Sequence, residues 1–328
     1  MKVVPGATLV LTVLNEQSSL PDFLISLSAQ ESLPSEIVVV DGGSTDATVA
    51  IFETWSVPAV CTLRVIVSPG ANISEGRNHA IEAASNSRII VTDAGTHLDK
   101  RWASFMLAAF DAPPSPDIVS GFFTPTGDTL MERSIAFTVT PRLAEIDPLT
   151  FLPSSRSIGF TRGAWAAAGG YPEWLDYCED LLFDLKLKEL GYQFHFEGDA
   201  RVTWSARPSL SAFMKQYYRY ARGDGKAGLW AKRHMARYSA YVVGVGLLAV
   251  TIVWPWAAIA LVAGVGGYMS KFWGRVWRGR KTFGSGLFAA LLLVPVIVVA
   301  GDLAKMTGYP VGLKWKRDHS EPTSIQPN

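Results

Sequence analysis

Residues 37–46 read Ile-Val-Val-Val-Asp-Gly-Gly-Ser-Thr-Asp. A run of β-branched apolar residues that ends in an acid and two glycines is typical of a buried strand followed by a tight turn. Similar runs alternate with helical patterns on both sides of this stretch, and the rhythm predicts an α/β fold built on a parallel sheet. The expected strands are 8–13, 37–40, 64–67 and 89–91, and the expected helices are 20–29, 45–55 and 74–84.

The residues that follow three of these strands are polar. Ligands of open parallel sheets bind outside the carboxyl ends of the strands, so these loops are the first candidates for a site. Ser44 to Asp46 fit two interpretations, a helix cap or a ligand loop. Asp41 is not needed for a cap, and its carboxylate can accept hydrogen bonds from a ring N–H or a ribose hydroxyl. The three loops hold Asn15 and Glu16, then Asp41 to Asp46, then Asp93-Ala94-Gly95.

Two common nucleotide motifs are missing from the chain. No Gly-x-Gly-x-x-Gly follows the first expected strand, and no Gly-x-x-x-x-Gly-Lys-Ser/Thr phosphate loop occurs anywhere. The sequence therefore argues against a nicotinamide-dependent enzyme and against an ATPase.

The charge is divided unevenly along the 328 residues. Residues 1–214 hold 14 Lys/Arg against 25 Asp/Glu, and residues 215–328 hold 16 Lys/Arg against 4 Asp/Glu. An acidic half binds nucleic acid poorly, and the basic half is interleaved with apolar runs rather than with a groove-reading motif. The pattern excludes nucleic acid as the expected partner and favours membrane lipid.

Two apolar runs in the basic half are long enough for transmembrane helices. Residues 238–273 contain no Asp or Glu, and the turn-like Trp254-Pro255-Trp256 suggests a hairpin; the second run is 283–301. Neither run contains a buried charge of the kind that a transporter needs. The basic residues on either side of the first run should face the cytoplasm. The expected organisation is a cytoplasmic domain over 1–214, a basic interfacial segment over 215–237, two to three spans within 238–304 and a polar tail over 305–328.

Several motifs occur together in one order, and in this they resemble the family 2 glycosyltransferases of GT-A fold. The resemblance covers residues 7 to about 225. It rests on Asn15-Glu16, on Val39-Val40-Asp41-Gly42-Gly43-Ser44-Thr45-Asp46, on Gly76-Arg77-Asn78-His79-Ala80-Ile81, on Thr92-Asp93-Ala94-Gly95, on Gly169-Gly170-Tyr171, on Glu179-Asp180 and on Gln216-x-x-Arg219-Tyr220.

The resemblance implies a nucleotide-sugar donor and transfer with inversion at the anomeric carbon. It makes Asp180 the general base, with Glu179 as its competitor; the alternative for both is an acid at a helix N-terminus. It places Asp41, Arg77, Asn15 and Glu16 at the nucleotide, and the alternative for Arg77 is a charge on a helix surface. Asn78 and His79 are expected to be structural.

The resemblance also implies a divalent metal, Mn²⁺ or Mg²⁺, on the donor diphosphate. Asp93 matches the first acid of the family's Asp-x-Asp motif, and Gly95 replaces the second. Such cations often bind through one or two carboxylates plus substrate phosphates, so Asp93 alone can serve. His97 and Asp99 follow as further candidates, with loop or cap positions as the alternative.

Gln216, Arg219 and Tyr220 match the Gln-x-x-Arg-Trp motif of processive members, with Tyr in place of Trp. Arg219 can neutralise diphosphate oxygens, and Tyr220 can stack on a sugar. The competing interpretation is an interfacial helix whose rings and cations lie among lipid headgroups.

Together these features predict an inverting, membrane-anchored glycosyltransferase of the inner membrane whose catalytic domain lies in the cytoplasm. The donor is expected to be a UDP-sugar and the acceptor a lipid-linked glycan or polysaccharide. A catalytically inactive scaffold of the same fold and a transport or flippase subunit remain as alternatives.

Overall fold

The computed structural model describes residues 2–57 and 61–319. The chain divides into two compact units. The first comprises Met1–Thr124 and Leu143–Ser205, and the second comprises Pro125–Arg142 and Ala206–Asn328. Residues 125–142, which the sequence assigned to the N-terminal domain, therefore lie with the C-terminal helices.

An eight-stranded mixed sheet runs through the first unit, in the order β3-β2-β1-β4-β7-β6-β8-β5. The pairs β1–β2, β1–β4 and β2–β3 are parallel, whereas β4–β7, β6–β7 and β5–β8 are antiparallel. The predicted α/β fold is confirmed, but the sheet is parallel only in its first four strands. The strands are β1 (Lys2–Val13), β2 (Ser32–Asp41), β3 (Thr62–Val67), β4 (Arg88–Val91), β5 (Thr96–Leu98), β6 (Ile118–Thr126), β7 (Ile158–Thr161) and β8 (Phe194–Ser205).

Helices cover both faces of this sheet. Alternate residues of β2 enter different apolar clusters: Ile37 and Val39 pack on one face, and Val38 and Val40 on the other. This alternation follows from the two-residue period of a strand, and it explains why β2 is apolar throughout. The helices are α1 (Leu20–Ser28), α2 (Thr48–Thr54), α3 (Ile73–Ala83), α4 (Trp102–Ala109), α6 (Arg162–Ala168) and α7 (Glu179–Glu189), with a short 3₁₀ turn at Leu143–Glu145.

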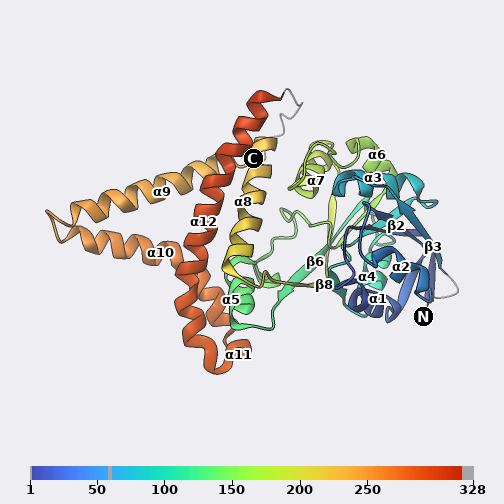
Figure 1. Cartoon of the computed structure of the whole chain (residues 1–328), viewed down its shortest axis with the longest axis horizontal. Coiled ribbons are helices and arrows are strands. Elements are labelled where there is room, and N and C mark those ends of the chain that lie inside the picture. Colours follow the sequence, from blue (N-terminus) through green and yellow to red (C-terminus); the bar gives the residue numbers. More distant parts are fainter. Residues whose placement is uncertain (1, 58–60, 320–328) are drawn as a thin grey trace. The chain divides into compact units, whose positions relative to one another are not determined.

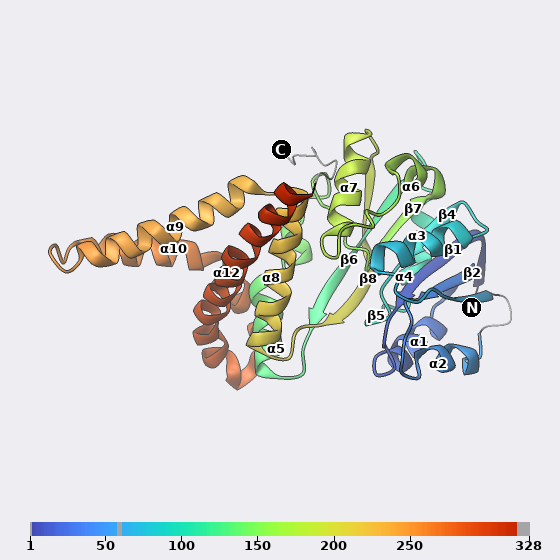
Figure 2. The same cartoon turned by 45° about the horizontal axis from the view of Figure 1, so that its top comes forward.

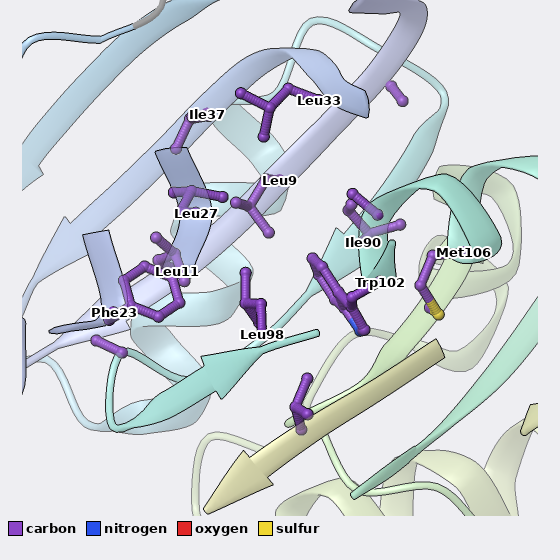
Figure 3. Packing of buried hydrophobic residues seen from close by; sticks show 14 of the residues in the cluster. Leu9, Leu11, Phe23, Leu27, Leu33, Ile37, Ile90, Leu98, Trp102 and Met106 are labelled. Atoms are coloured by element: carbon purple, nitrogen blue, oxygen red, sulfur yellow. The ribbon is translucent and has the colours of Figure 1, made fainter. Parts of the chain in front are cut away.

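Helices α1 and α4 supply the first face of the core. Phe23 and Leu27 of α1 and Trp102 and Met106 of α4 are fully buried against Leu9 and its neighbours in the sheet (Figure 3). On the opposite face, residues of α3, α6 and α7 pack against the other side of the strands. The sheet is therefore held in place from both sides, which fixes the loops at its edge.

The second unit consists of helices. Its elements are α5 (Leu130–Val139), α8 (Leu210–Ala227), α9 (Ala231–Val250), α10 (Ala257–Arg278), α11 (Arg280–Phe283), a 3₁₀ turn at Gly284–Gly286 and α12 (Leu287–Asp318). Helices α9 and α10 lie side by side in both views and are joined by a turn that contains Trp254-Pro255-Trp256 (Figure 1). The two helices and their turn lie where the sequence predicted a hairpin, and passage of this hairpin through a membrane stays a prediction.

Helices α8 and α12 approach each other closely enough that glycine is required. A Cβ on Gly312 would lie 2.1 Å from the carbonyl oxygen of Arg222, and one on Gly308 would lie 2.3 Å from that of Tyr218. Small residues of this kind let two helix backbones come into contact. The two helices run together in both views (Figure 2).

Among the described residues, one helical stretch is long and apolar enough to cross a membrane, Arg280–Asp318. Of its most apolar window, 44% is buried inside the protein. Helices α9 and α10 do not meet the same standard, so the structure supports one candidate span where the sequence predicted two to three. Residues 305–318, predicted as a polar tail, continue α12.

A buried acid also lies within α12. Asp302 is 4% exposed and accepts hydrogen bonds from Arg237 Nε at 2.8 Å, from the Tyr268 hydroxyl at 2.6 Å and from the Tyr241 hydroxyl at 3.2 Å. Asp302 directly follows the apolar run 283–301, in which no charge was expected, and only the packing of the helices buries it. Because both oxygens have donors and the charge is paired with Arg237, the group is satisfied structurally.

In the first unit, one acid is buried in the core without a hydrogen-bond partner among the described residues. Asp184 of α7 is fully buried, and neither of its carboxyl oxygens has a donor. Burial raises the pKa of Asp184 well above its usual range, and the nearby Asp180 carboxylate adds to the shift. Asp184 is therefore protonated in the folded protein under conditions in which the unfolded chain ionises it.

This difference makes the free energy of unfolding depend on pH. The pKa of Asp184 is higher in the folded state, so the unfolded state releases its proton first as pH rises. The contribution of Asp184 to the free energy of unfolding is therefore complete below about pH 4 and is lost as pH rises. Replacing Asp184 with Asn removes the titration. Above pH 4, the free energy of unfolding of the parent protein should therefore fall relative to that of Asp184→Asn. We expect this difference to be up to about 1.4 kcal/mol per pH unit.

Denaturant titrations of the purified protein at several pH values between 4 and 8 measure this difference. Asp22→Asn, which removes an exposed acid from α1, is the matched control and should follow the parent protein. Parallel curves for Asp184→Asn and the parent protein would contradict the assignment.

Candidate functional site

The loop after β2 is shaped by its own acid. Asp41 is 1% exposed; its Oδ2 accepts hydrogen bonds from the backbone N–H of Gly43 at 2.9 Å and of Ser44 at 2.8 Å, and its Oδ1 accepts one from the Ser44 hydroxyl. Gly43 has φ of +98°, and a Cβ there would meet the backbone of Pro69 at 3.1 Å. The carboxylate and the glycine together fix a tight turn at the edge of the sheet.

The loop after β1 is joined to this turn. Asn15 Oδ1 accepts a hydrogen bond from Thr45 N–H at 2.9 Å, and the Asn15 N–H donates to the Ser44 hydroxyl at 2.8 Å. Glu16 N–H donates to the Thr48 hydroxyl at 2.8 Å. Hydrogen bonds therefore bring together three of the residues predicted at the nucleotide, Asn15, Glu16 and Asp41, at one edge of the sheet.

Asp46 stabilises the turn that leads into α2. Its Oδ1 accepts a hydrogen bond from Thr48 N–H at 2.9 Å, and its Oδ2 accepts one from Gln17 N–H at 3.1 Å. Hydrogen bonds, the largest from the Thr48 hydroxyl, lower the pKa of Asp46. The cap interpretation of Ser44 to Asp46 is wrong in its position, because the residue that precedes α2 is Ala47 and no side chain caps the helix there. A ligand role for this loop stays a prediction.

Arg77 is at the centre of the site. Its side chain is 2% exposed, with Nη1 at 2.7 Å from Glu179 Oε1 and Nη2 at 3.0 Å from Asp93 Oδ1. The guanidinium also lies 5.2 Å from the ring centre of Tyr171. The alternative of a surface charge on a helix is wrong for Arg77. One buried cation joins two of the predicted acids, and Glu179 is 102 residues away from Arg77 in sequence.

The start of α3 is fixed so that Arg77 points inward. Asn72 caps the helix by accepting from Ser74 and Glu75 N–H, and the Glu75 carboxylate accepts in return from Asn72 N–H. One turn further on, Asn78 donates to the carbonyl of Tyr171 at 2.9 Å and accepts from its N–H at 2.8 Å. Asn78 is therefore structural, as predicted.

The acid pair begins α7. The Glu179 side chain is 10% exposed and bound to Arg77. Burial raises the pKa of Glu179 to about 7; the neighbouring Asp180 adds to this shift, and the ion pair with Arg77 opposes it. Asp180 is half-buried, and its Oδ1 accepts from the adjacent Leu181 N–H at 2.8 Å. Both acids lie in the first turn of the helix, so the predicted helix-terminal position is also correct.

Asp93 follows β4 and is the acid expected to bind metal. Its side chain is 28% exposed. A Cβ added to the nearby Gly95 would have no neighbouring atom within 4 Å, so the space beside this loop is open. Among the described residues, no three His, Cys, Asp or Glu side chains are grouped closely enough to hold an ion. The residues fit a cation that takes one protein carboxylate and completes its shell with substrate phosphates and water. Asp99 accepts instead from Arg101 N–H at 3.1 Å, as a loop acid does.

Arg156, which no sequence motif marked, lies beside Asp93. Its Nε lies 3.8 Å from Asp93 Oδ2. Arg156 precedes β7, and Ile158 of β7 pairs with Val91 of β4 in antiparallel register. The start of β7 therefore lies at the edge where β4 ends. The βαβ rhythm did not predict an antiparallel strand next to β4, so no signal marked this arginine.

Gln216 and Arg219 lie on α8, in the second unit. Gln216 is 7% exposed and donates from Nε2 to the Tyr220 hydroxyl at 2.8 Å. The two motif residues Gln216 and Tyr220 thus bind each other across one helical turn. Contact of Gln216 or Arg219 with a donor stays a prediction.

Comparison with known proteins bears on the family and the fold. Residues 8–160 match the model of glycosyl transferase family 2. The mannosyltransferase PcManGT from Pyrobaculum calidifontis, solved in complex with GDP-Man and Mn²⁺, aligns at 17% identity over 89% of this chain and 86% of its own, with a TM-score of 0.61. S. aureus TarS 1-349 in complex with UDP-GlcNAc aligns at 17% identity over 97% of this chain and 92% of its own, with a TM-score of 0.49. No curated protein sequence matches the chain.

The likeness to PcManGT shows a shared fold, and the family match begins within β1 and ends within β7. The segment that matches thus contains Asp41, Arg77, Asp93 and Arg156. Residues 8–160 therefore form a glycosyl transferase family 2 domain, and the chain has the GT-A fold.

Proposed function

We propose that this enzyme transfers a sugar, with inversion, from a nucleotide-diphosphate sugar to a membrane-associated acceptor. The observation that carries the proposal is the arrangement around Arg77. This one buried cation holds Asp93, at the carboxyl end of β4, and Glu179, next to Asp180 at the start of α7. The acid suited to the donor diphosphate is thus joined through Arg77 to Glu179, the direct neighbour of the acid suited to the acceptor.

The transfer needs a base and a stabilised leaving group. The acceptor hydroxyl oxygen attacks the anomeric carbon, its proton passes to a carboxylate, and the bond from that carbon to the diphosphate oxygen breaks with the electron pair leaving on the diphosphate. Asp180 is the better base, because it is half-buried and its Oδ1 accepts a hydrogen bond from the N–H of Leu181 in its own helix. Glu179 is bound to Arg77 and is less accessible.

The loops after β1 and β2 are suited to the nucleoside. Asp41 holds the turn whose Gly42 and Gly43 let a flat ligand approach the backbone, and Asn15 joins the two loops. The family suggests UDP, whereas PcManGT was solved with GDP-Man, so both bases belong in the test.

Asp93 is the residue that would hold Mn²⁺ or Mg²⁺. When bound, such a cation supplies positive charge to the departing diphosphate. The fit rests on a partly exposed carboxylate beside open space at Gly95. The Mn²⁺ in the PcManGT structure is consistent with it.

The membrane location is also part of the proposal. The stretch Arg280–Asp318 is apolar enough to span a bilayer, and the α9–α10 hairpin exposes Trp254 and Trp256 at its turn, with exposed fractions of 62% and 71%. Tryptophans prefer membrane interfaces, and basic residues near the helix ends favour the cytoplasmic side. The acceptor is then a lipid-linked glycan or polysaccharide at the cytoplasmic face of the inner membrane.

The first test is release of nucleoside diphosphate from a panel of UDP-, GDP- and other nucleotide sugars by membranes that contain the protein. We expect one donor to be turned over with Mn²⁺ or Mg²⁺ and the release to stop with a chelator. Binding of donor without release under any condition would favour the inactive scaffold. Absence of binding to every donor would contradict the proposal.

The second test separates the roles of the acids. We expect Asp180→Asn to lower turnover by a factor of roughly 10²–10⁴ while the Kd for the nucleoside diphosphate changes less than twofold, since a general base acts on the acceptor. Asp41→Ala should raise that Kd at least tenfold, because its loop loses three hydrogen bonds. Titration calorimetry and an initial-rate assay measure the two effects.

Glu179→Gln is the control for Asp180→Asn, because it neutralises the neighbouring acid. If Glu179→Gln abolishes turnover and Asp180→Asn does not, Glu179 is the base. Equal loss of nucleotide binding in Asp180→Asn and Asp41→Ala would contradict the division of roles.

The third test concerns the membrane. We expect the full chain to stay in the pellet when membranes are washed with alkaline carbonate, because α12 is held by apolar contact with lipid. Replacing Val296 and Val299, both exposed on α12, with Lys should shift the protein to the supernatant. Release of the unaltered chain by carbonate would contradict a transmembrane anchor.

A further inference from the structure

Two arginines flank Asp93, and they differ in accessibility. Arg77 is 2% exposed and is bound to two carboxylates at 2.7 and 3.0 Å. For Arg77 to reach a ligand it would have to abandon a buried ion pair, which is costly in a low-dielectric interior. Arg156 is 19% exposed, and its Nε lies 3.8 Å from the carboxylate, beyond hydrogen-bond length.

The guanidinium of Arg156 is held in a fixed position. Its carbon lies 5.0 Å from the ring centre of Trp204 and 5.6 Å from that of Phe123. Its Nη1 donates to the Ser154 hydroxyl at 3.0 Å. Cation–π contacts with two rings keep the planar group oriented, so little side-chain entropy is lost when it binds an anion.

The backbone of Arg156 is fixed as well. Its carbonyl accepts a hydrogen bond from the Thr92 hydroxyl at 2.7 Å, and Thr92 is the residue immediately before Asp93. The adjacent β4–β7 register pairs Val91 with Ile158. Arg156 and Asp93 therefore keep a constant spacing at the carboxyl end of β4, where open α/β sheets bind their ligands.

We propose that Arg156 is the residue of the first unit that binds the diphosphate oxygens of the nucleotide-sugar donor. The inference rests on the proposed function and makes it more specific. Arg77 is then a positioning residue, because it orients Asp93 and Glu179 and does not itself meet the donor.

Arginine is suited to this task for two reasons. Its planar fork of N–H donors matches a phosphate with two parallel hydrogen bonds, and it stays charged at every physiological pH. As the bond to the sugar breaks, negative charge grows on the diphosphate, and a fixed cation stabilises that charge. Since this contact is direct, it operates with or without a divalent ion.

The experiment compares nucleotides that differ by one phosphate. Titration calorimetry of the purified full chain gives Kd for UDP and UMP, and for GDP and GMP, each with EDTA and with Mn²⁺. We expect Arg156→Ala to raise the Kd of the diphosphate at least tenfold and that of the monophosphate less than threefold, in both media. Arg156→Lys keeps the charge but loses the fork, so we expect at least a threefold weaker diphosphate affinity.

Arg88→Ala is the matched control. Arg88 also lies over an aromatic ring, Phe110 at 5.8 Å, and beside an acid, Asp111 at 2.6 Å, but it begins β4 and so lies at the opposite end of the strand from Asp93. We expect its Kd values to match those of the unaltered protein. Circular dichroism checks the fold, and Arg156→Lys carries the test if the alanine variant is unfolded.

Two results would overturn the inference. One is equal weakening of the diphosphate and the monophosphate, which would make Arg156 structural; the other is a diphosphate affinity of Arg156→Lys equal to that of the unaltered protein. A different failure belongs to the proposed function: if the unaltered protein binds none of the four nucleotides in either medium, the nucleotide-sugar site itself is wrong.

Discussion

The buried guanidinium of Arg77 is the constraint on which the rest of the first unit depends. Removing an arginine from water costs several kcal/mol, and that cost is offset only if carboxylates meet it with good geometry. Asp93 and Glu179 do so at 3.0 and 2.7 Å. Loss of either acid would leave the charge of Arg77 only partly compensated. The spacing between the end of β4, the start of α3 and the start of α7 is therefore fixed.

The arrangement also separates two acids that are adjacent in sequence. Glu179 faces inward to Arg77, whereas Asp180 is half-buried and is not bound to that cation. Neighbouring residues in the first turn of a helix point about 100° apart, so one can complete the core while the other remains accessible. Glu179 thus stabilises the core, and Asp180 stays accessible for the proposed role as general base.

Much of the fold was predictable because it follows from local patterns. The β-branched runs predicted the first four strands. Because the carboxyl ends of parallel strands lie at one edge of a sheet, Asn15, Glu16, Asp41 and Asp93 were expected there. Arg156 and the partnerless Asp184 were not predictable, because each depends on an antiparallel strand or a buried position that only tertiary packing creates. The same holds for Asp302, whose partner Arg237 is 65 residues away.

The glycine contacts between α8 and α12 have a mechanical consequence. At Gly308 and Gly312 the two backbones touch, with no side chain between them that could change rotamer and absorb a displacement. The two helices are therefore expected to move together, and if α12 spans a bilayer as proposed, its depth and tilt also set the height of α8. Bilayer thickness would then be a variable that adjusts the position of Gln216 and Arg219.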